Sequence, residues 1–244
     1  MQVIDAQGLD YRILNSKVRG LVESGEQSFH LENVNGHRYI ACGLSGPLSI
    51  EIEGTGGNDL AAYINGPKIV VNGNVQDCIC NTMNSGTVVV TGRAGDILGY
   101  GASGGEIYIR GDVGSRCGIH LKGTKEKAPV MVIGGVAGDF LGEYMAGGTI
   151  IVLGLDNEGP PAGRQIGVGM HGGAIYIRGN GLEEAPGVGT EICELTSRDT
   201  EIISRYVQKF SKHFDLNYEQ LMQPGFIKIA PKGKRPYGTM YVGI

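Results

Sequence analysis

The chain has 244 residues, of which 43 are glycine, more than twice the roughly 7% share of an average protein. Its net charge of -4 and pI near 5.8 describe an ordinary surface without the stripe of basic side chains that binds a phosphate backbone. We therefore do not expect nucleic acid as a partner. No apolar run approaches the roughly 20 residues that cross a bilayer, and residues 1–12 lack the features of a signal peptide, so we expect a cytoplasmic protein.

A short block of alternating apolar residues recurs through the middle of the chain. The clearest copies read GTVVVTG at 86–92, GEIYIRG at 105–111, PVMVIGG at 129–135, GTIIVLG at 148–154 and GAIYIRG at 173–179. Their starts lie 19, 24, 19 and 25 residues apart, and PLSIEIEG at 47–54 and PKIVVNG at 67–73 extend the series upstream. A repeat of this length indicates a stack of about seven coils.

Each block has room for about five extended residues, and every second residue should point inward. The inward pairs are Val88 and Val90, Ile107 and Ile109, Met131 and Ile133, Ile150 and Val152, and Ile175 and Ile177. All are apolar, so equivalent strands of successive coils can stack as a parallel ladder around one core. The predicted fold is therefore all-β: a right-handed, single-stranded parallel β-helix.

Glycine-bracketed segments such as AGDILGYGASGG (94–105) join the blocks. Glycine suits the corners of a coil because they need positive φ and close approach of stacked turns. Asp96 and Asp139 recur at equivalent Gly-Asp positions, and we interpret each as a cap of its own turn. His120 and His171 lie beside glycine at expected corners, where a solvent-facing turn residue is the default interpretation.

Five cysteines are scattered along the chain with no CxxC pair, which fits neither a disulfide framework nor a zinc or iron–sulfur site. We interpret them as free thiols. Cys78 and Cys80 are one residue apart on an expected strand, so their side chains should face opposite sides and cannot readily share a metal ion.

The C-terminal region changes character. Residues 197–213 place an apolar set on one helical face, preceded by Thr196 and Asp199 at capping-box spacing. The members of that set are Ile202, Ile203, Tyr206, Val207 and Phe210. A helical turn at 217–222 and a strand at 226–231 should follow. We expect three parts: an N-terminal cap at 1–45, the β-helix at 46–195, and a helix and strand at 196–244 that cap the other open end.

The middle residue of each block should point outward. In chain order these residues are Glu51, Val70, Val89, Tyr108, Val132, Ile151 and Tyr176. The six apolar members form a contiguous row of a kind that is usually covered. We expect the row, at least from Val89 to Ile151, to contact another subunit or another copy of the chain. The alternative is that residues 1–45 or the C-terminal helix lie over it.

The segments EYMAGGTIIVL (143–153) and GRQIGVGMHGG (163–173), followed by an IYI strand, resemble the C-terminal domain of the glutamate synthase large subunit, the GXGXG domain. The tail FIKIAPKGKR (226–235) is similar to the end of that subunit, so the resemblance covers nearly the whole chain. In that family the domain is a β-helix that holds the amidotransferase and flavin domains in place and supplies no catalytic residue. One position departs, since a cysteine often precedes EYM there and this chain has Gly142.

The resemblance implies a non-catalytic structural subunit in an oxidoreductase complex for glutamate biosynthesis, inactive alone. It implies no catalytic, cofactor-binding or metal-binding residue on this chain, with FMN and an iron–sulfur cluster carried by partners. Because the chain holds neither an amidotransferase nor a flavin domain, these partners would be a separate glutamine amidotransferase and an FMN-binding glutamate synthase subunit. Assembly with further copies of the same chain, as a homo-oligomer, is a second alternative for the partner. Glu143, Tyr144 and Met145 are further interface candidates.

Two other functional classes stay open. The C subunit of formylmethanofuran dehydrogenase shares the repeat fold, so the chain could be a scaffold in another redox complex. A stand-alone β-helix enzyme acting on polysaccharide is the third class. It is the least favoured because such enzymes usually line a groove with acids, bases and aromatics, and tryptophan is absent here.

Overall fold

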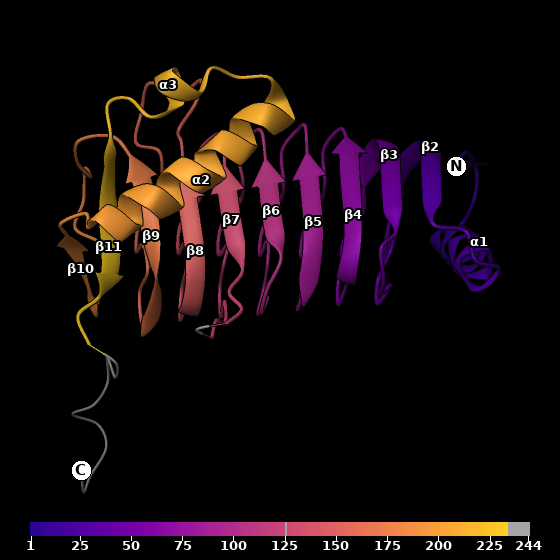
Figure 1. Ribbon diagram of the computed structural model, residues 1–244, viewed down its shortest axis with the longest axis horizontal. Helices are drawn as coiled ribbons and strands as arrows, with labels where there is room; N and C mark the ends of the chain where they lie inside the picture. The colour runs from indigo at the N-terminus through magenta and orange to yellow at the C-terminus, as the bar shows by residue number, and fades with distance from the viewer. Residues whose placement is uncertain (125, 234–244) are drawn as a thin grey trace, which may run out of the picture.

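Stacked parallel strands form the body of the protein (Figure 1). The computed structural model describes residues 1–124 and 126–233. In chain order the elements are β1 (Gln2–Asp5), α1 (Tyr11–Glu23), β2 (Ser28–His37), β3 (Ser49–Gly56), β4 (Asn65–Asn72), β5 (Ser85–Val90), β6 (Glu106–Ile109), β7 (Val130–Ile133), β8 (Ala146–Val152), β9 (Gly172–Arg178), β10 (Thr190–Cys193), α2 (Ser197–Phe214), α3 (Tyr218–Leu221) and β11 (Phe226–Pro231). The strands make one sheet in the order β1 to β9, then β11, then β10.

Strands β1 to β9 pair in parallel with their neighbours, as a β-solenoid requires. The register aligns the inward positions coil after coil, so that Val88 lies opposite Ile107 and Ile107 opposite Met131. The predicted inward residues are all buried and belong to one continuous core. The parallel β-helix inferred from the repeats is thereby confirmed.

A second line of contacts joins the coils just after each strand. Ala94, Val113, Ala137 and Ala162 form successive parallel bridges. Beside them, the carboxylate of Asp96 accepts a hydrogen bond from the Ser115 amide at 2.8 Å. Asp139 accepts one from the Arg164 amide at 2.8 Å, and this bond is the main reason that its pKa is lowered. Each aspartate therefore caps the next coil. The interpretation from sequence, that each caps its own turn, was wrong.

The N-terminal region contributes to the sheet itself. β1 and β2 pair in parallel with each other, and β2 pairs with β3, so the ladder begins well before residue 46. Helix α1 lies at this end of the stack (Figure 1) and buries Leu14 and Val18 in the main core. Residues 1–45 thus provide both the first strands and the cover of the open end.

Helix α2 lies diagonally over the outer face of the sheet (Figure 1). It begins at the Thr196–Asp199 capping box predicted from sequence and buries Ile203, Val207 and Phe210. These side chains form a second apolar core with the outward row of strands β5 to β9. That row is Val89, Tyr108, Val132, Ile151 and Tyr176, each no more than 3% exposed.

The covered row corrects the sequence-based expectation of a partner at these five residues. Of the two alternatives, the structure shows the one in which the chain's own C-terminal helix lies over the row. The helix therefore covers a face of the stack, whereas the C-terminal end is extended by β11 and β10, which pair antiparallel to β9 and to β11. None of the helices in the described ranges has the length and apolarity needed to cross a membrane.

Asp199 holds the start of α2 against the sheet. Its carboxylate accepts hydrogen bonds from the Tyr176 hydroxyl at 2.5 Å and from the Lys228 ammonium at 2.9 Å, besides those of the capping residue Thr196. Burial raises the pKa of Asp199, but these donors outweigh it and hold the pKa well below its ordinary value. The ionised form is thus the one that joins β9, β11 and α2.

We expect Asp199→Asn to lower the free energy of unfolding at pH 7 by about 3 kcal/mol, because the substitution leaves the partly buried Lys228 charge without its partner. Since the folded-state pKa is lowered, the contribution of Asp199 is present above its unfolded pKa of about 4 and is lost as the pH falls below it. Urea unfolding at pH 7, 5, 4 and 3 measures this loss. An unchanged difference between wild type and variant across that range would contradict the assignment, and Glu219→Gln serves as an exposed control.

Candidate functional site: the face of alternating φ

A five-residue segment of unusual conformation forms another face of each coil. In seven successive coils the first, third and fifth residues of this segment have positive φ, between 51° and 72°. The triplets are Tyr39, Ala41 and Gly43; Asp59, Ala61 and Tyr63; Cys78, Cys80 and Thr82; Ile97, Gly99 and Gly101; Arg116, Gly118 and His120; Phe140, Gly142 and Tyr144; and Gln165, Gly167 and Gly169. Fourteen of these 21 positions hold residues other than glycine, which rarely adopt positive φ, yet all 21 share this geometry.

Hydrogen bonds between coils explain why the strain persists. In the second coil, the amide of Ala61 donates back to the carbonyl of Ile40 at 2.9 Å. The flanking amides of Asp59 and Tyr63 donate forward to Asp77 and Asn81 at 3.1 and 2.8 Å. Alternating φ turns successive amides in opposite directions, so each segment is bonded to both neighbours. These bonds offset a left-handed penalty of roughly 1–2 kcal/mol per non-glycine residue.

The middle residue of each segment faces the core and is small. Alanine, cysteine or glycine occupies all seven middle positions. A Cβ on Gly142 would lie 2.6 Å from Cδ1 of Ile175, which explains the limit on size. Cys80 occupies the same middle position three coils before Gly142, so the packing at these positions accepts either cysteine or glycine.

Cys78 and Cys80 do not lie on a strand, so the strand predicted there from the sequence was wrong. Cys78 and Cys80 both have φ of 60° and lie in one alternating segment, with Cys80 buried and Cys78 half-buried. All five cysteines are free thiols. Burial raises the pKa of Cys80, and it raises the pKa of Cys117 to about 12, so neither is a reactive thiolate at neutral pH.

The outer positions of the same segments carry exposed aromatic side chains. Tyr39, Tyr63 and Tyr144 are 43%, 53% and 38% exposed, and Tyr100, beside Gly101, is 41% exposed. The His120 ring stacks on Tyr144 at 5.5 Å and meets Tyr100 edge-on at 5.8 Å. Exposed tyrosines of this density are typical of protein-binding surfaces. We call this set of exposed side chains the tyrosine face.

The residues of the EYM segment have three different environments. Tyr144 is exposed on the tyrosine face, whereas Met145 is fully buried in the core and cannot contact a partner. Glu143 is 8% exposed, and its carboxylate lies 3.5 Å from the Arg116 guanidinium. Arg116 in turn lies over the Phe140 ring at 5.2 Å. Of the three interface candidates, Tyr144 is therefore accessible, and Glu143 forms an ion pair with the exposed Arg116.

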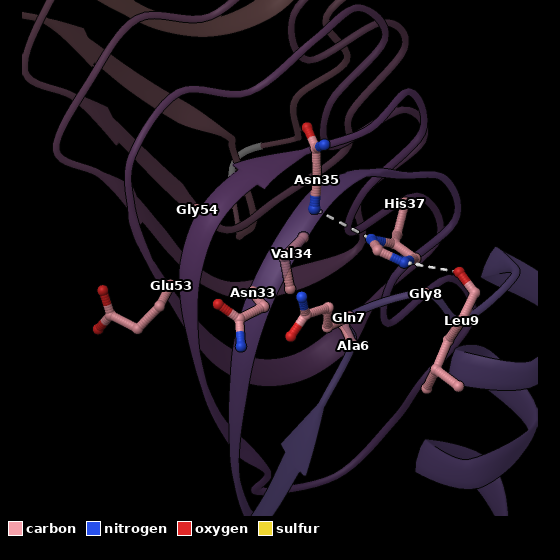
Figure 2. A pocket seen from close by; sticks show the side chains of 10 residues that line it. All are labelled: Ala6, Gln7, Gly8, Leu9, Asn33, Val34, Asn35, His37, Glu53 and Gly54. Carbon is pink, nitrogen blue, oxygen red and sulfur yellow. Dashed lines mark hydrogen bonds between the residues drawn. The ribbon is translucent and has the colours of Figure 1, made fainter.

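A surface pocket lies at the N-terminal end, between the turn after β1, strand β2 and the end of β3 (Figure 2). His37 forms one side of it. Its Nδ1 accepts from the Asn35 amide at 3.1 Å, so Nε2 carries the proton and donates to the Leu9 carbonyl at 2.9 Å. Both nitrogens of the neutral ring are engaged in joining β2 to the N-terminal turn, which leaves no ring nitrogen for a ligand.

The chain is similar to a known protein family over most of its length. The GXGXG motif model matches residues 27–232, which is most of the chain and includes every complete coil from β2 to β11. The chain belongs to the GXGXG family. In the segment QIGVG (165–169), glycine occupies the third and fifth residues, and both have positive φ.

A relative of this GXGXG protein occurs in Methanocaldococcus jannaschii, as a protein described as uncharacterised. The two are 47% identical over 249 residues, an alignment that covers 98% of this chain and 95% of the relative. The archaeal protein thus matches this chain over nearly its full length.

Sequence reasoning missed the tyrosine face, although a signal was present. From sequence, the glycine-rich segments between the strands were interpreted only as corners of the coils. A small residue recurs at the middle position of each of these segments, and that recurrence is the signal of a repeated positive-φ segment. His120 lies on the face as an aromatic partner of two tyrosines, and His171 is exposed beside β9.

Proposed function

We propose that this GXGXG protein is a non-catalytic structural subunit of a glutamate-synthase-like assembly. In this proposal it holds a separate glutamine amidotransferase and an FMN- and iron–sulfur-containing synthase subunit in position. The observation that carries the proposal is the family match across the solenoid, from residue 27 to residue 232. The chain would take part in glutamate biosynthesis in the cytoplasm without forming or breaking a bond itself.

The tyrosine face supports the proposal because it offers an accessible binding surface on a rigid support. The outward row under α2 is already covered, so a partner needs another surface. The tyrosine face is fixed by hydrogen bonds in every coil and carries exposed tyrosines at both ends of the stack, from Tyr39 to Tyr144. Rigid aromatic side chains bind partners at a low entropic cost. We assign the partner interface to this face.

Affinity purification of the chain from its native cells tests the proposal. We expect an amidotransferase and a flavin- and iron–sulfur-containing subunit to co-elute, and we expect the purified chain alone to be colourless and without glutaminase activity. Stoichiometric flavin on the isolated chain would contradict the proposal. Co-elution of formylmethanofuran dehydrogenase subunits, or activity of the chain on pectin-like polymers, would assign it to one of the other two classes.

Substitution of the tyrosine face locates the interface. The double variant Tyr63→Ala/Tyr144→Ala should fold normally, because both side chains are exposed, and should bind the purified partners at least tenfold more weakly. Ile13→Ala, which removes a 50% exposed side chain on α1, is the matched control and should bind as wild type does. Unchanged binding of the double variant would place the partners elsewhere.

A further inference from the structure

Helix α2 leaves the outer face of strands β2 and β3 uncovered (Figure 1), and the side chains there differ from the rest of the row. His30 on β2 lies directly opposite Glu51 on β3, and Glu53 follows on the same face. One potential ligand atom from each of the three lies within 4.8 Å of the other two. Within the described part of the chain, no lysine or arginine forms an ion pair with either glutamate.

The His30 ring has an unsatisfied nitrogen in this cluster. Its Nδ1 is buried and has no hydrogen-bond partner, and it lies 3.5 Å from Oε2 of Glu51. Buried polar atoms are almost always paired, so an unpaired ring nitrogen this close to a carboxylate needs an explanation. Two ligands about 2.1 Å from a tetrahedral ion lie about 3.4 Å apart, and the observed separation of 3.5 Å fits a shared ion.

Two neighbouring side chains, Asn72 and Glu32, orient the candidate ligands. The Asn72 side chain on β4 donates to Oε1 of Glu51 at 3.2 Å and to Oε1 of Glu53 at 2.6 Å, which orients both carboxylates and leaves their second oxygens free of that bond. On the other side of the ring, Nε2 of His30 lies 3.6 Å from the carboxylate of Glu32. A carboxylate behind the second ring nitrogen is the usual support of a metal-binding histidine.

We propose that His30, Glu51 and Glu53 bind one divalent transition-metal ion, which joins β2 and β3 at the N-terminal part of the solenoid. One imidazole and two carboxylates suit Zn²⁺ and its first-row neighbours better than Mg²⁺, which prefers oxygen ligands and water. The ion supplies the positive charge that the two glutamates lack and uses the free Nδ1 of His30. This assignment is independent of the partner proposal and revises the expectation that the chain holds no metal ligands.

The ligands escaped the sequence analysis because they are far apart along the chain. Between His30 and Glu51 lie a bulged stretch of β2 and a whole coil, and the parallel register alone brings them together. Metal motifs are recognised by short fixed spacings, and this cluster has none.

Calorimetric titration of the untagged full chain with Zn²⁺ at pH 7 tests the site. We expect about one ion per chain and a rise of several degrees in the melting temperature at excess Zn²⁺. Glu53→Gln, at a half-buried surface position, and His30→Gln should each abolish both effects. Asn72→Ala should weaken binding about 10- to 100-fold, as loss of a supporting residue does. His171→Gln removes an exposed histidine elsewhere and should bind as wild type does.

The following results would overturn the assignment. The first is absence of Zn²⁺ binding by the wild-type chain. The second is binding that survives in both His30→Gln and Glu53→Gln, or Mg²⁺ binding of equal strength. The third is a histidine nitrogen spectrum that shows His30 protonated on both nitrogens and unchanged by Zn²⁺, since a charged ring between Glu32 and Glu51 would then replace the ion. Retained folding of Glu53→Gln keeps the test valid if His30→Gln fails to fold.

Discussion

The double variant Val132→Lys/Ile151→Lys is expected to fail to fold. Both side chains are fully buried between the sheet and α2, in the core that includes Ile203, Val207 and Phe210. Burying an unpaired ammonium costs several kcal/mol, and two of them on adjacent strands also repel each other. The combined cost, on the order of 6 kcal/mol or more, is comparable with the whole stability of a typical domain.

Circular dichroism and size-exclusion chromatography measure this result, which we expect to be an aggregated or unfolded product. Val3→Lys/Val188→Lys is the control, because these valines are 58% and 70% exposed and should accept lysine with little effect. If the Val132/Ile151 variant folds normally and loses only an association, the row is a partner interface and α2 leaves it in solution.

Gly118→Val should destabilise the protein by about 4 kcal/mol, because it combines backbone strain with a clash. Gly118 has φ of +72°, and its added Cβ would lie 2.4 Å from Cδ1 of Ile150. Ile150 is fully buried on β8 and cannot turn toward solvent. Gly43 offers a matched control, since its φ is +71° and nothing lies within 4 Å of its added Cβ.

Gly43→Val should therefore cost only the strain, about 2 kcal/mol for a branched residue in the left-handed region. Denaturant unfolding of the two variants separates the two contributions, because the backbone angle is the same in both. Equal losses of stability would show that conformational strain alone, and not the core packing, limits the middle positions to small residues.

The strands and the C-terminal elements could be predicted from the sequence because their signals are local. Alternation of apolar residues identifies the inward face of each strand, and the repeat length identifies the stack. Helix α2 was predicted from its apolar face and from Thr196 and Asp199, and both the capping box and the helix are present. Strand β11 was likewise predicted at its observed bounds, 226–231.

The place of α2 depended on tertiary structure. A periodic pattern shows that Val132 and Phe210 each need a cover, but not that each covers the other, because a partner subunit could satisfy either surface. The link is made by long-range contacts: Asp199 with Tyr176 and Lys228, and Lys209 with Glu106 at 2.6 Å. The sequence of each segment, taken alone, does not indicate these pairings.

The alternating-φ segments show a similar division. The sequence determines that coils repeat and that glycine or another small residue recurs between strands, because side-chain size and spacing follow directly from the order of residues. Only the folded structure decides that Tyr63, Cys78 and Phe140 adopt a left-handed backbone, because hydrogen bonds to the coils on either side offset the strain. Likewise, His30 meets Glu51 only through the register of β2 on β3, a contact between residues that are a full coil apart.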